Sequence, residues 1–577
     1  MRSCFGKTIL AASSVTILAL AAACAGSAQR QEPADLVFTN GVVATADSAR
    51  PTAQAIAVRG DRVAAVGTTQ EIQAYVGEKT KVIDLAGRFA MPGLIESHAH
   101  FTGVGEAKMQ LELMGTRTWD EIVAMVAEAA KKAQPGAWIV GRGWHQEKWE
   151  RPPSPAVEGF PTEALLSKAA PDNPVLLTHA SGHATIANRK AMELAGLTSK
   201  TANPAGGEIL KDAKGEPTGV LRETASNLVG RAYARALAAR TPEQVERDND
   251  REVELAIEEF LSKGITAVHD AGASFADVDR FKRFADAGRL RLRLYVMLSE
   301  SNERLKAQGA KYRMVDAGNG HLTVRAIKRL ADGALGSRGA WLLEPYADLP
   351  GSTGLNTYPM DQLAETARFA AENGFQLCVH AIGDRANRET LNVYEAAYKA
   401  HPDQKEMRWR IEHAQHIAAS DIPRFGALGV IPSMQGIHCT SDAPYVLARL
   451  GPARAAEGAY PWQKLMKSGA VIPNGTDAPV EAVDPLPGYH ALVARRQKNG
   501  EVFFGDQAMS REEALKSYTL NGAYAAFEEK ARGSLTPGKY ADITVLSADI
   551  TRVPEAEIEK AQVLYTVVNG KIEYEKK

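Results

Sequence analysis

Cysteine is scarce in this chain, and neither sign of charge is in excess. The four cysteines among 577 residues are Cys4, Cys24, Cys378 and Cys439, and the first two fall in a leader-like start. We therefore expect no disulfide framework in the folded part. Lys and Arg number 68 against 69 Asp and Glu. This balance excludes the basic footprint of a nucleic-acid-binding protein.

Long apolar runs are also missing, apart from one at the start. Arg2 and Lys7 precede a mostly apolar run over 8–23, which is short for a membrane-spanning helix. Its end, Ala21-Ala22-Ala23-Cys24, is similar to the lipobox of bacterial lipoproteins, whose Cys is lipidated. We predict a lipoprotein-type signal peptide over 1–24, with ordinary cleavage nearby as the alternative. The protein is then exported to the periplasm, and a lipid anchor in the outer membrane would be its membrane contact.

Two stretches at opposite ends of the remaining chain have the pattern of β-structure. In 35–90, short apolar runs such as Leu36-Val37-Phe38 are separated by Asn-Gly and Gly-Asp turn signals. The same pattern returns in 533–577, with apolar runs at 541–546 and 563–568. We predict one small β-sandwich domain built from both chain ends.

Strand and helix patterns alternate between these ends. Amphipathic stretches at 242–263 and 361–373 are typical of helices. The candidate strands lie at 94–100, 264–269, 290–298, 324–330, 376–380, 409–413, 430–434 and 471–474. Eight strands joined by helices are what a TIM-like (β/α)8 barrel requires. The predicted fold class is therefore α/β, with a barrel over 91–532 and a substrate-shaping insertion over 104–240 after the first barrel strand.

The first barrel strand ends in His98-Ala99-His100. Both histidines point to one side, because alternate residues of a strand share a face. Alone, such a pair fits a hydrogen-bonded core as well as a metal site. The chain also places His380, His413 and Asp477 at the ends of strands five, six and eight, where barrel enzymes gather their catalytic groups. Histidine and carboxylate ligands suit a divalent metal, zinc foremost.

With these residues in view, the chain resembles the amidohydrolase superfamily and, more narrowly, its amidohydrolase family 3 or YtcJ-like branch, which includes N-substituted formamide deformylases. The resemblance covers essentially the whole mature chain and implies a metal-bearing barrel with a β-sandwich made from both ends. The matching segments are 35–37, 92–100, 182–183, 217–223, 268–272, 332–338, 380–386, 411–415 and 538–542.

The resemblance also implies a role for each ligand. His98 and His100 would hold a first metal together with Asp477, and His380 and His413 would hold a second one; the number of ions is left open. Lys328, on strand four, would join them as a carbamate formed with carbon dioxide, because an ammonium cannot ligate a cation. The alternative for Lys328 is an ion pair with a neighbouring acid.

The implied reaction is hydrolysis of a C–N bond in a small amide or formamide-type substrate. A metal-activated water attacks, and Asp477 acts as general base and then as general acid. A deaminase or a lactonase would use the same site. A non-catalytic binding lipoprotein on the same barrel is the alternative of a different class. The oligomeric state is left open, and a homodimer is compatible with the sequence.

Further side chains are weaker candidates for substrate or supporting contacts, and a structural hydrogen bond is the alternative for each. They are Trp144, His183, His269, Asp332 and Gln435. His438, which follows strand seven, can line the same mouth. The chain departs from its relatives at Glu96 and at Asn474-Gly475-Thr476, where Asp and Gly-Ser are commoner, so local hydrogen bonding is expected to differ there.

Overall fold

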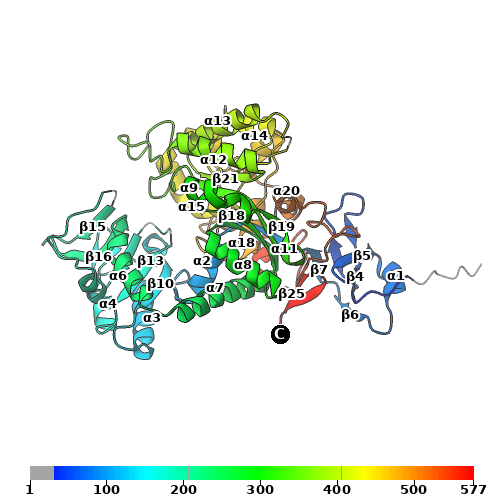
Figure 1. Ribbon diagram of the computed structural model, residues 1–577, viewed down its shortest axis with the longest axis horizontal. Coiled ribbons are helices and arrows are strands. Elements are labelled where there is room, and N and C mark those ends of the chain that lie inside the picture. Colours follow the sequence, from blue (N-terminus) through cyan, green and yellow to red (C-terminus); the bar gives the residue numbers. More distant parts are fainter. Residues whose placement is uncertain (1–30, 181, 183, 206, 405) are drawn as a thin grey trace, which may run out of the picture.

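The computed structural model describes residues 31–577 except 181, 183, 206 and 405. The predicted signal peptide at 1–24 therefore lies outside the described residues. Within them, no helix is long and apolar enough to cross a bilayer. Figure 1 shows three parts in a row: the inserted subdomain at one side, the barrel in the middle and the β-sheets of the chain ends at the other side.

A sheet of parallel strands forms the middle part, in the order β8-β17-β18-β20-β21-β22-β23. The strands are β8 (Leu94–Ala99), β17 (Ile265–Ala273), β18 (Arg293–Leu298), β20 (Leu322–Leu330), β21 (Gln376–Ala381), β22 (Arg410–His413) and β23 (Ile431–Ser433). The connecting helices include α7 (Pro242–Ser262), α8 (Phe275–Asp286), α12 (Met360–Asn373), α13 (Asp384–Ala400) and α14 (Ile422–Leu428). Seven of the eight predicted strands are thus present.

The eighth predicted strand, at 471–474, is not a regular strand. Pro473 has no N–H to donate, which interrupts a ladder. The segment nevertheless bonds to both neighbours: Met434 N donates to Pro473 O (3.1 Å), and Ser97 N donates to Asn474 O (3.1 Å). It fills the gap between β23 and β8 and closes the barrel, so the predicted fold class is confirmed while one of its strands is irregular.

Two helix boundaries follow from local sequence signals. Helix α7 begins after Thr241, whose side chain accepts a hydrogen bond from the backbone N–H of Gln244, with Pro242 at the first helical position. Helix α12 ends before Gly374, whose φ of +68° is a left-handed conformation suited to glycine. Both helices pack apolar faces against the barrel, which leaves the strand ends free to carry the site.

The chain ends meet in two packed sheets, in the orders β5-β4-β1-β6 and β26-β25-β24-β7-β2-β3. Their strands are β1 (Leu36–Thr39), β2 (Val42–Ala44), β3 (Thr52–Ala53), β4 (Ala55–Arg59), β5 (Arg62–Gly67), β6 (Lys81–Asp84), β7 (Phe89–Pro92), β24 (Ile543–Leu546), β25 (Val563–Val568) and β26 (Lys571–Glu575). Phe38, Ile56 and Val545 belong to one buried apolar cluster drawn from both sheets. The sandwich is therefore a composite of the two ends.

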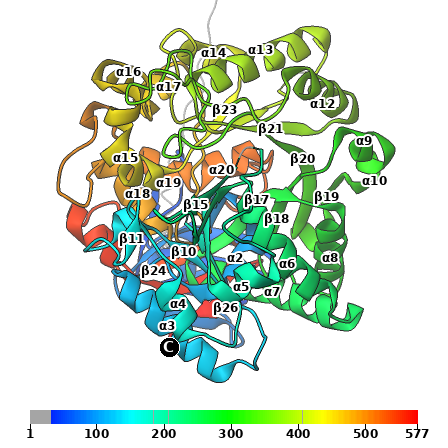
Figure 2. The same cartoon turned by 90° about the vertical axis from the view of Figure 1, so that its left-hand side faces the viewer.

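The insertion between β8 and α7 has its own mixed sheet, ordered β15-β16-β14-β13-β10-β9. Its strands are β9 (Leu111–Glu112), β10 (Ile139–Trp144), β13 (Val175–His179), β14 (Ala184–Ala187), β15 (Gly207–Lys211) and β16 (Pro217–Glu223), and its helices include α3 (Trp119–Lys132), α4 (Ala164–Ala169), α5 (Arg189–Leu194) and α6 (Ser226–Ala238). Two apolar clusters of its own give it a separate core. Figure 2 looks onto this subdomain, which lies in front of the barrel.

Candidate metal centre

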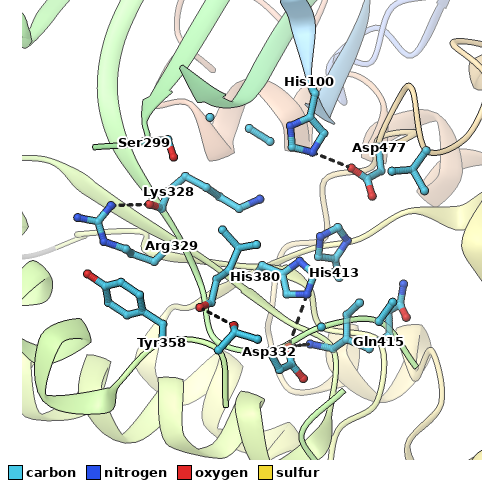
Figure 3. A pocket seen from close by; sticks show the side chains of 18 of the residues that line it. His100, Ser299, Lys328, Arg329, Asp332, Tyr358, His380, His413, Gln415 and Asp477 are labelled. Atoms are coloured by element: carbon cyan, nitrogen blue, oxygen red, sulfur yellow. Dashed lines mark hydrogen bonds and ion pairs between the residues drawn. The ribbon is translucent and has the colours of Figure 1, made fainter. Parts of the chain in front are cut away.

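Six of the predicted side chains meet at the carboxyl end of the barrel, as Figure 3 shows for five of them. They are His98, His100, Lys328, His380, His413 and Asp477. The Nε2 atoms of His98 and His100 each lie 3.4 Å from Oδ1 of Asp477. These three side chains form a compact set of potential ligands. The rings of His380 and His413 lie beside it, with their centroids 4.5 Å apart.

Backbone turns bring two of these side chains into the site. Arg410 and Glu412 are two residues apart on β22 and share the face that points into the barrel. Regular strand geometry would therefore point the next residue, His413, to the opposite face. His413 instead has a φ of +73°, and Asp477 has a φ of +59°. A left-handed conformation is uncommon for these residue types and often marks a functional position. The turns redirect both side chains towards His98.

Several buried atoms at the site have no hydrogen-bond partner within the described residues, among them Nε2 of His380, Nε2 of His438 and Oδ1 of Asp477. Such atoms are costly unless something binds them. His413 Nδ1 faces Oε1 of Gln435 at 2.7 Å and His98 Nδ1 contacts Oε2 of Glu412, so both rings turn Nε2 towards the site. Inward-facing imidazoles beside a carboxylate fit a divalent metal.

The electrostatics keep these groups in the forms that bind metal. Burial, helped by the charge of Lys328, lowers the pKa of His380 to about 3. Burial and the neighbouring His380 likewise hold the pKa of His413 well below its usual range. Burial alone would raise the pKa of Asp477, but the closeness of His100 and His98 outweighs burial and keeps that pKa well below its usual range. Neutral imidazoles and an ionised carboxylate are what coordination requires.

Lys328 lies among these groups and is 4% exposed. Its Nζ is 3.4 Å from Nε2 of His98, and Figure 3 shows the side chain reaching into the space between His100 and His380. No ion pair joins Lys328 to an acid within the described residues, and burial lowers the pKa of its ammonium. A lowered pKa favours the neutral amine, the form that reacts with carbon dioxide.

The buried ion pair of Arg410 and Glu412 contacts the potential ligand His98. Arg410 donates from Nε to Oε1 of Glu412 (2.7 Å) and from a terminal nitrogen to Oε2 (2.9 Å), and Glu412 contacts His98. Another Arg410 nitrogen lies 3.0 Å from Nδ1 of His269. His269 is therefore a buried neighbour of the Arg410–Glu412 pair and does not line the cavity. The sequence reasoning missed Arg410 and Glu412, although their alternation in Arg410-Ile411-Glu412 was a usable signal.

Asp332 organises the loop after β21. Its carboxylate accepts backbone hydrogen bonds from Ile382 (3.0 Å), Gly383 (2.8 Å) and Trp341 (2.8 Å), and burial raises its pKa to about 7. Oδ1 is also 3.5 Å from Nε2 of His380. The structure therefore gives Asp332 a place beside His380 and ties it to the surrounding backbone.

The weaker candidates of the insertion have different surroundings. Trp144 is fully buried in the core of the insertion, and its indole N–H donates to Leu177 O at 3.0 Å. The next residue, His145, lines the cavity instead. His183 lies outside the described residues. The insertion thus contributes to the mouth, but not through Trp144.

The two departures from the family pattern contact each other. Glu96 is fully buried, and its carboxyl oxygens accept from Thr476 N (2.8 Å), Thr476 Oγ1 (2.9 Å) and His98 N (3.1 Å). Glu96 therefore links the first barrel strand to the segment that carries Asp477. These hydrogen bonds between Glu96 and Thr476 are the local difference that the sequence led us to expect.

One cavity of about 1260 Å³ opens over these groups. His100, Lys328, His380, His413 and Asp477 all line it.

The walls of this cavity come from barrel loops and from the insertion, which supplies His145, Lys148 and Ala180. Lys148 Nζ lies 3.9 Å from a carboxylate oxygen of Glu481 on the barrel side. Apolar wall comes from side chains such as Leu330 and Leu335. A buried ligand set under a partly apolar cavity is suited to a small molecule.

A parallel barrel with histidines and a carboxylate at the carboxyl ends of its strands defines the class of metal-dependent hydrolases. The amidohydrolase family model matches residues 81–574, so the chain belongs to this family. The putative amidohydrolase YtcJ of Bacillus subtilis is 32% identical over 91% of this chain and 96% of its own length. The family and branch predicted from the sequence are confirmed.

Other relatives carry different names. The protein LONG AFTER FAR-RED 3 of Arabidopsis thaliana is 33% identical over 93% of this chain and 91% of its own length. An N-substituted formamide deformylase of Arthrobacter pascens is 28% identical over 94% of this chain and 98% of its own length. Among solved structures, an uncharacterised metal-dependent hydrolase of Pyrococcus furiosus superposes with a TM-score of 0.70 at 27% identity, covering 90% of this chain and all of that one.

Proposed function

We propose that this protein hydrolyses a C–N bond of a small amide or formamide-type substrate, with zinc as the metal and Asp477 as general base and acid. One observation carries the proposal: Oδ1 of Asp477 lies 3.4 Å from Nε2 of both His98 and His100, at the floor of the cavity. A carboxylate in that position can hold an ion and exchange a proton with a water bound beside it.

The chemistry divides between the metal and the chain. His98, His100 and Asp477 would hold a divalent metal, with His380 and His413 available for a second ion; when bound, the metal would lower the pKa of a water beside it towards roughly 7 and polarise a carbonyl. Asp477 accepts the proton of the attacking water and returns it to the departing amine nitrogen. The C–O bond to the attacking water oxygen forms first, and the C–N bond then breaks with its electron pair leaving on the nitrogen, which takes the returned proton to complete the amine product.

The proposed substrate class rests on a relative and on the cavity. The Arthrobacter pascens relative is named an N-substituted formamide deformylase. A cavity of about 1260 Å³ exceeds the usual range of pockets for drug-sized ligands, roughly 300–1,000 Å³. The space is therefore sufficient for a bulky substituent on the amide nitrogen, next to apolar side chains such as Leu330 and Leu335.

A substrate screen on purified, metal-analysed protein tests the proposal. N-substituted formamides, N-acyl amino acids, lactones and amino-substituted heterocycles separate the amidohydrolase from a lactonase and a deaminase. Asp477→Asn should lower kcat by about 10²- to 10⁴-fold, whereas Asp286→Asn, at an exposed ion pair with Lys282 on α8, should not. Full turnover by Asp477→Asn would refute the mechanism. Protein without bound metal or turnover would favour the non-catalytic alternative.

We also propose that the protein is exported and anchored through Cys24. The support is the leader pattern over 1–24, with its apolar run and the Ala-Ala-Ala-Cys end. In a bacterial host, the wild-type protein should then fractionate with membranes and incorporate labelled palmitate. Cys24→Ser should abolish the label. Unlabelled wild-type protein in the periplasmic fraction would indicate ordinary signal cleavage instead.

A further inference from the structure

His438 lies at the centre of the site without an assigned role. It is in the first turn of α15 (Gly436–Leu450), the helix that follows β23, and it lines the same cavity as Asp477. The residue is 6% exposed, and its Nε2 has no hydrogen-bond partner within the described residues. Nε2 lies 3.9 Å from Oδ2 of Asp477, which is too far for a hydrogen bond.

The partner of Nδ1 determines which nitrogen of His438 carries the proton. Nδ1 lies 3.1 Å from Nε2 of Gln415, an amide nitrogen that can only donate. Nδ1 is therefore the acceptor, and the ring N–H is on Nε2, facing the cavity. Figure 3 shows Gln415 beside His413 on the same side of the site.

The neighbouring His413 has the opposite arrangement. Its Nδ1 faces the carbonyl oxygen of Gln435 at 2.7 Å, while the amide nitrogen of Gln435 donates to Ser433 O at 3.3 Å. Nδ1 of His413 therefore donates, which leaves a lone pair on Nε2 for a metal. The two glutamines thus give the two histidines different chemistry: His413 presents an acceptor to the site and His438 presents a donor.

Building on the proposed function, we propose that His438 is a catalytic residue that donates its Nε2–H to the carbonyl oxygen of the substrate. Preorganised donors of this kind stabilise the negative charge that develops on the oxygen during attack. The Nε2 proton of His438 is not transferred, so Asp477 alone still moves the proton from the attacking water to the amine nitrogen. The helix α15 fixes the donor beside Asp477, where the attacked carbonyl has to lie.

A competing assignment makes His438 a metal ligand. His413, His438 and Asp477 each have a potential ligand atom within 4.8 Å of the others. A ligating Nε2 needs a lone pair, and hence a proton on Nδ1 that points to an acceptor. Gln415 presents its amide nitrogen at that place. The hydrogen bonding therefore favours the donor over the ligand, and metal content separates the two.

The test compares two substitutions of similar size. His438→Gln keeps an N–H near the position of Nε2, whereas His438→Met fills the space without a donor. His438→Met should lose about 10²- to 10³-fold in kcat, the usual effect of removing one oxyanion donor, with KM and metal content close to those of the parent. His438→Gln should regain at least tenfold. Loss of one metal equivalent in both variants, or unchanged kcat in His438→Met, would overturn the proposal.

A second variant changes the tautomer and leaves His438 in place. In Gln415→Glu, the carboxylate accepts a hydrogen bond from Nδ1–H, so the neutral ring carries its proton on Nδ1 and the donor at Nε2 is lost. This variant should match His438→Met in kcat, while Gln415→Met, which imposes neither tautomer, should be less impaired. Circular dichroism and melting temperature check that each variant is folded. Full activity of Gln415→Glu would count against the assignment.

Binding of a tetrahedral analogue gives a measurement that needs no turnover. The anilide of methylphosphonic acid carries a charged oxygen where the attacked carbonyl oxygen would be. Calorimetry should show it binding about 10²-fold or more weakly to His438→Met than to the parent, and equal affinities would refute the donor role. Rates are measured on any carbonyl substrate that the parent hydrolyses, lactones included, so failure of the amide assignment is distinguishable from failure of this one.

Discussion

His98 donates a hydrogen bond from Nδ1 to Oε2 of Glu412, and both side chains are fully buried. Glu412 in turn is held by two hydrogen bonds from Arg410. Burial alone would raise the pKa of Glu412, but the charge of Arg410 keeps it well below its usual range, so the carboxylate is ionised. An ionised acceptor fixes the proton of His98 on Nδ1, which leaves Nε2 free for the metal.

This relationship predicts that Glu412→Gln weakens metal binding. A neutral amide orients His98 less firmly and does not compensate Arg410, so the metal affinity should fall by about 10- to 100-fold. The melting temperature should fall as well, because the charge of Arg410 is left buried and unpaired. Competition with a chelator measures the affinity. Glu406→Gln, at an exposed carboxylate that contacts Arg408, is the matched control, and equal affinities in the two variants would contradict the role of Glu412.

The paired histidines of β8 should be dispensable for folding. His98→Ala with His100→Ala removes two of the three potential ligands in the set completed by Asp477, so the first metal position should be empty by elemental analysis and turnover should be lost. The barrel should remain folded by circular dichroism, because its strands are held by backbone ladders and apolar packing. The single variant His321→Ala, at a half-buried imidazole that contacts Leu292 O, controls for the loss of a histidine elsewhere. Global unfolding of the double variant would mean that the pair is structural.

Lys328 should respond to carbon dioxide. Its burial lowers the pKa of the ammonium, and Nζ lies 3.4 Å from Nε2 of His98, so an unmodified cation would repel a metal there. We expect bicarbonate during metal loading to raise the metal content, and native mass spectrometry to show the added mass of one carbon dioxide. Lys328→Met should lose both responses, while Lys306→Met, at an exposed lysine, should keep them. Bicarbonate-independent loading would argue against a carbamate.

Much of this architecture can be read from the sequence, because it depends on local patterns. Alternation predicts that His98 and His100 share a face, and the end of β21 predicts the placement of His380. The irregular eighth strand escapes such reasoning. Pro473 breaks the pattern of a strand, yet the segment is held by bonds to Met434 and Ser97, which are distant in sequence.

The supporting contacts are harder to predict, because they depend on how strands lie next to one another. Glu412 comes within reach of His98 only when the barrel closes, and His413 faces the site only because its φ is +73°. Trp144 fails as a pocket candidate for a similar reason. A six-stranded sheet buries it inside the insertion, and the next residue, His145, lines the cavity instead.

Glu252 should make stability depend on pH at a place remote from the metal. It lies on α7 where that helix packs against α2 (Phe101–Lys108), and the contact is so close that a Cβ on Gly105 would lie 1.9 Å from Glu252 O. Burial, and then repulsion by Glu106, raise the pKa of Glu252 from 4.5 to about 7. Between these two values the folded state holds a proton that the unfolded state releases, so stability falls as the pH rises.

Replacing Glu252 by a neutral side chain should therefore stabilise the fold most at higher pH. The melting temperature of Glu252→Gln should exceed that of the parent by a margin that grows from about pH 5 to about pH 7 and is then constant, because an amide side chain needs no proton to stay neutral. Differential scanning calorimetry across this range measures the margin. Glu258→Gln, at an exposed glutamate of the same helix, should run parallel to the parent. A margin for Glu252→Gln that shrinks as the pH rises would show that Arg280 and Arg240 outweigh burial and keep the carboxylate ionised in the folded protein.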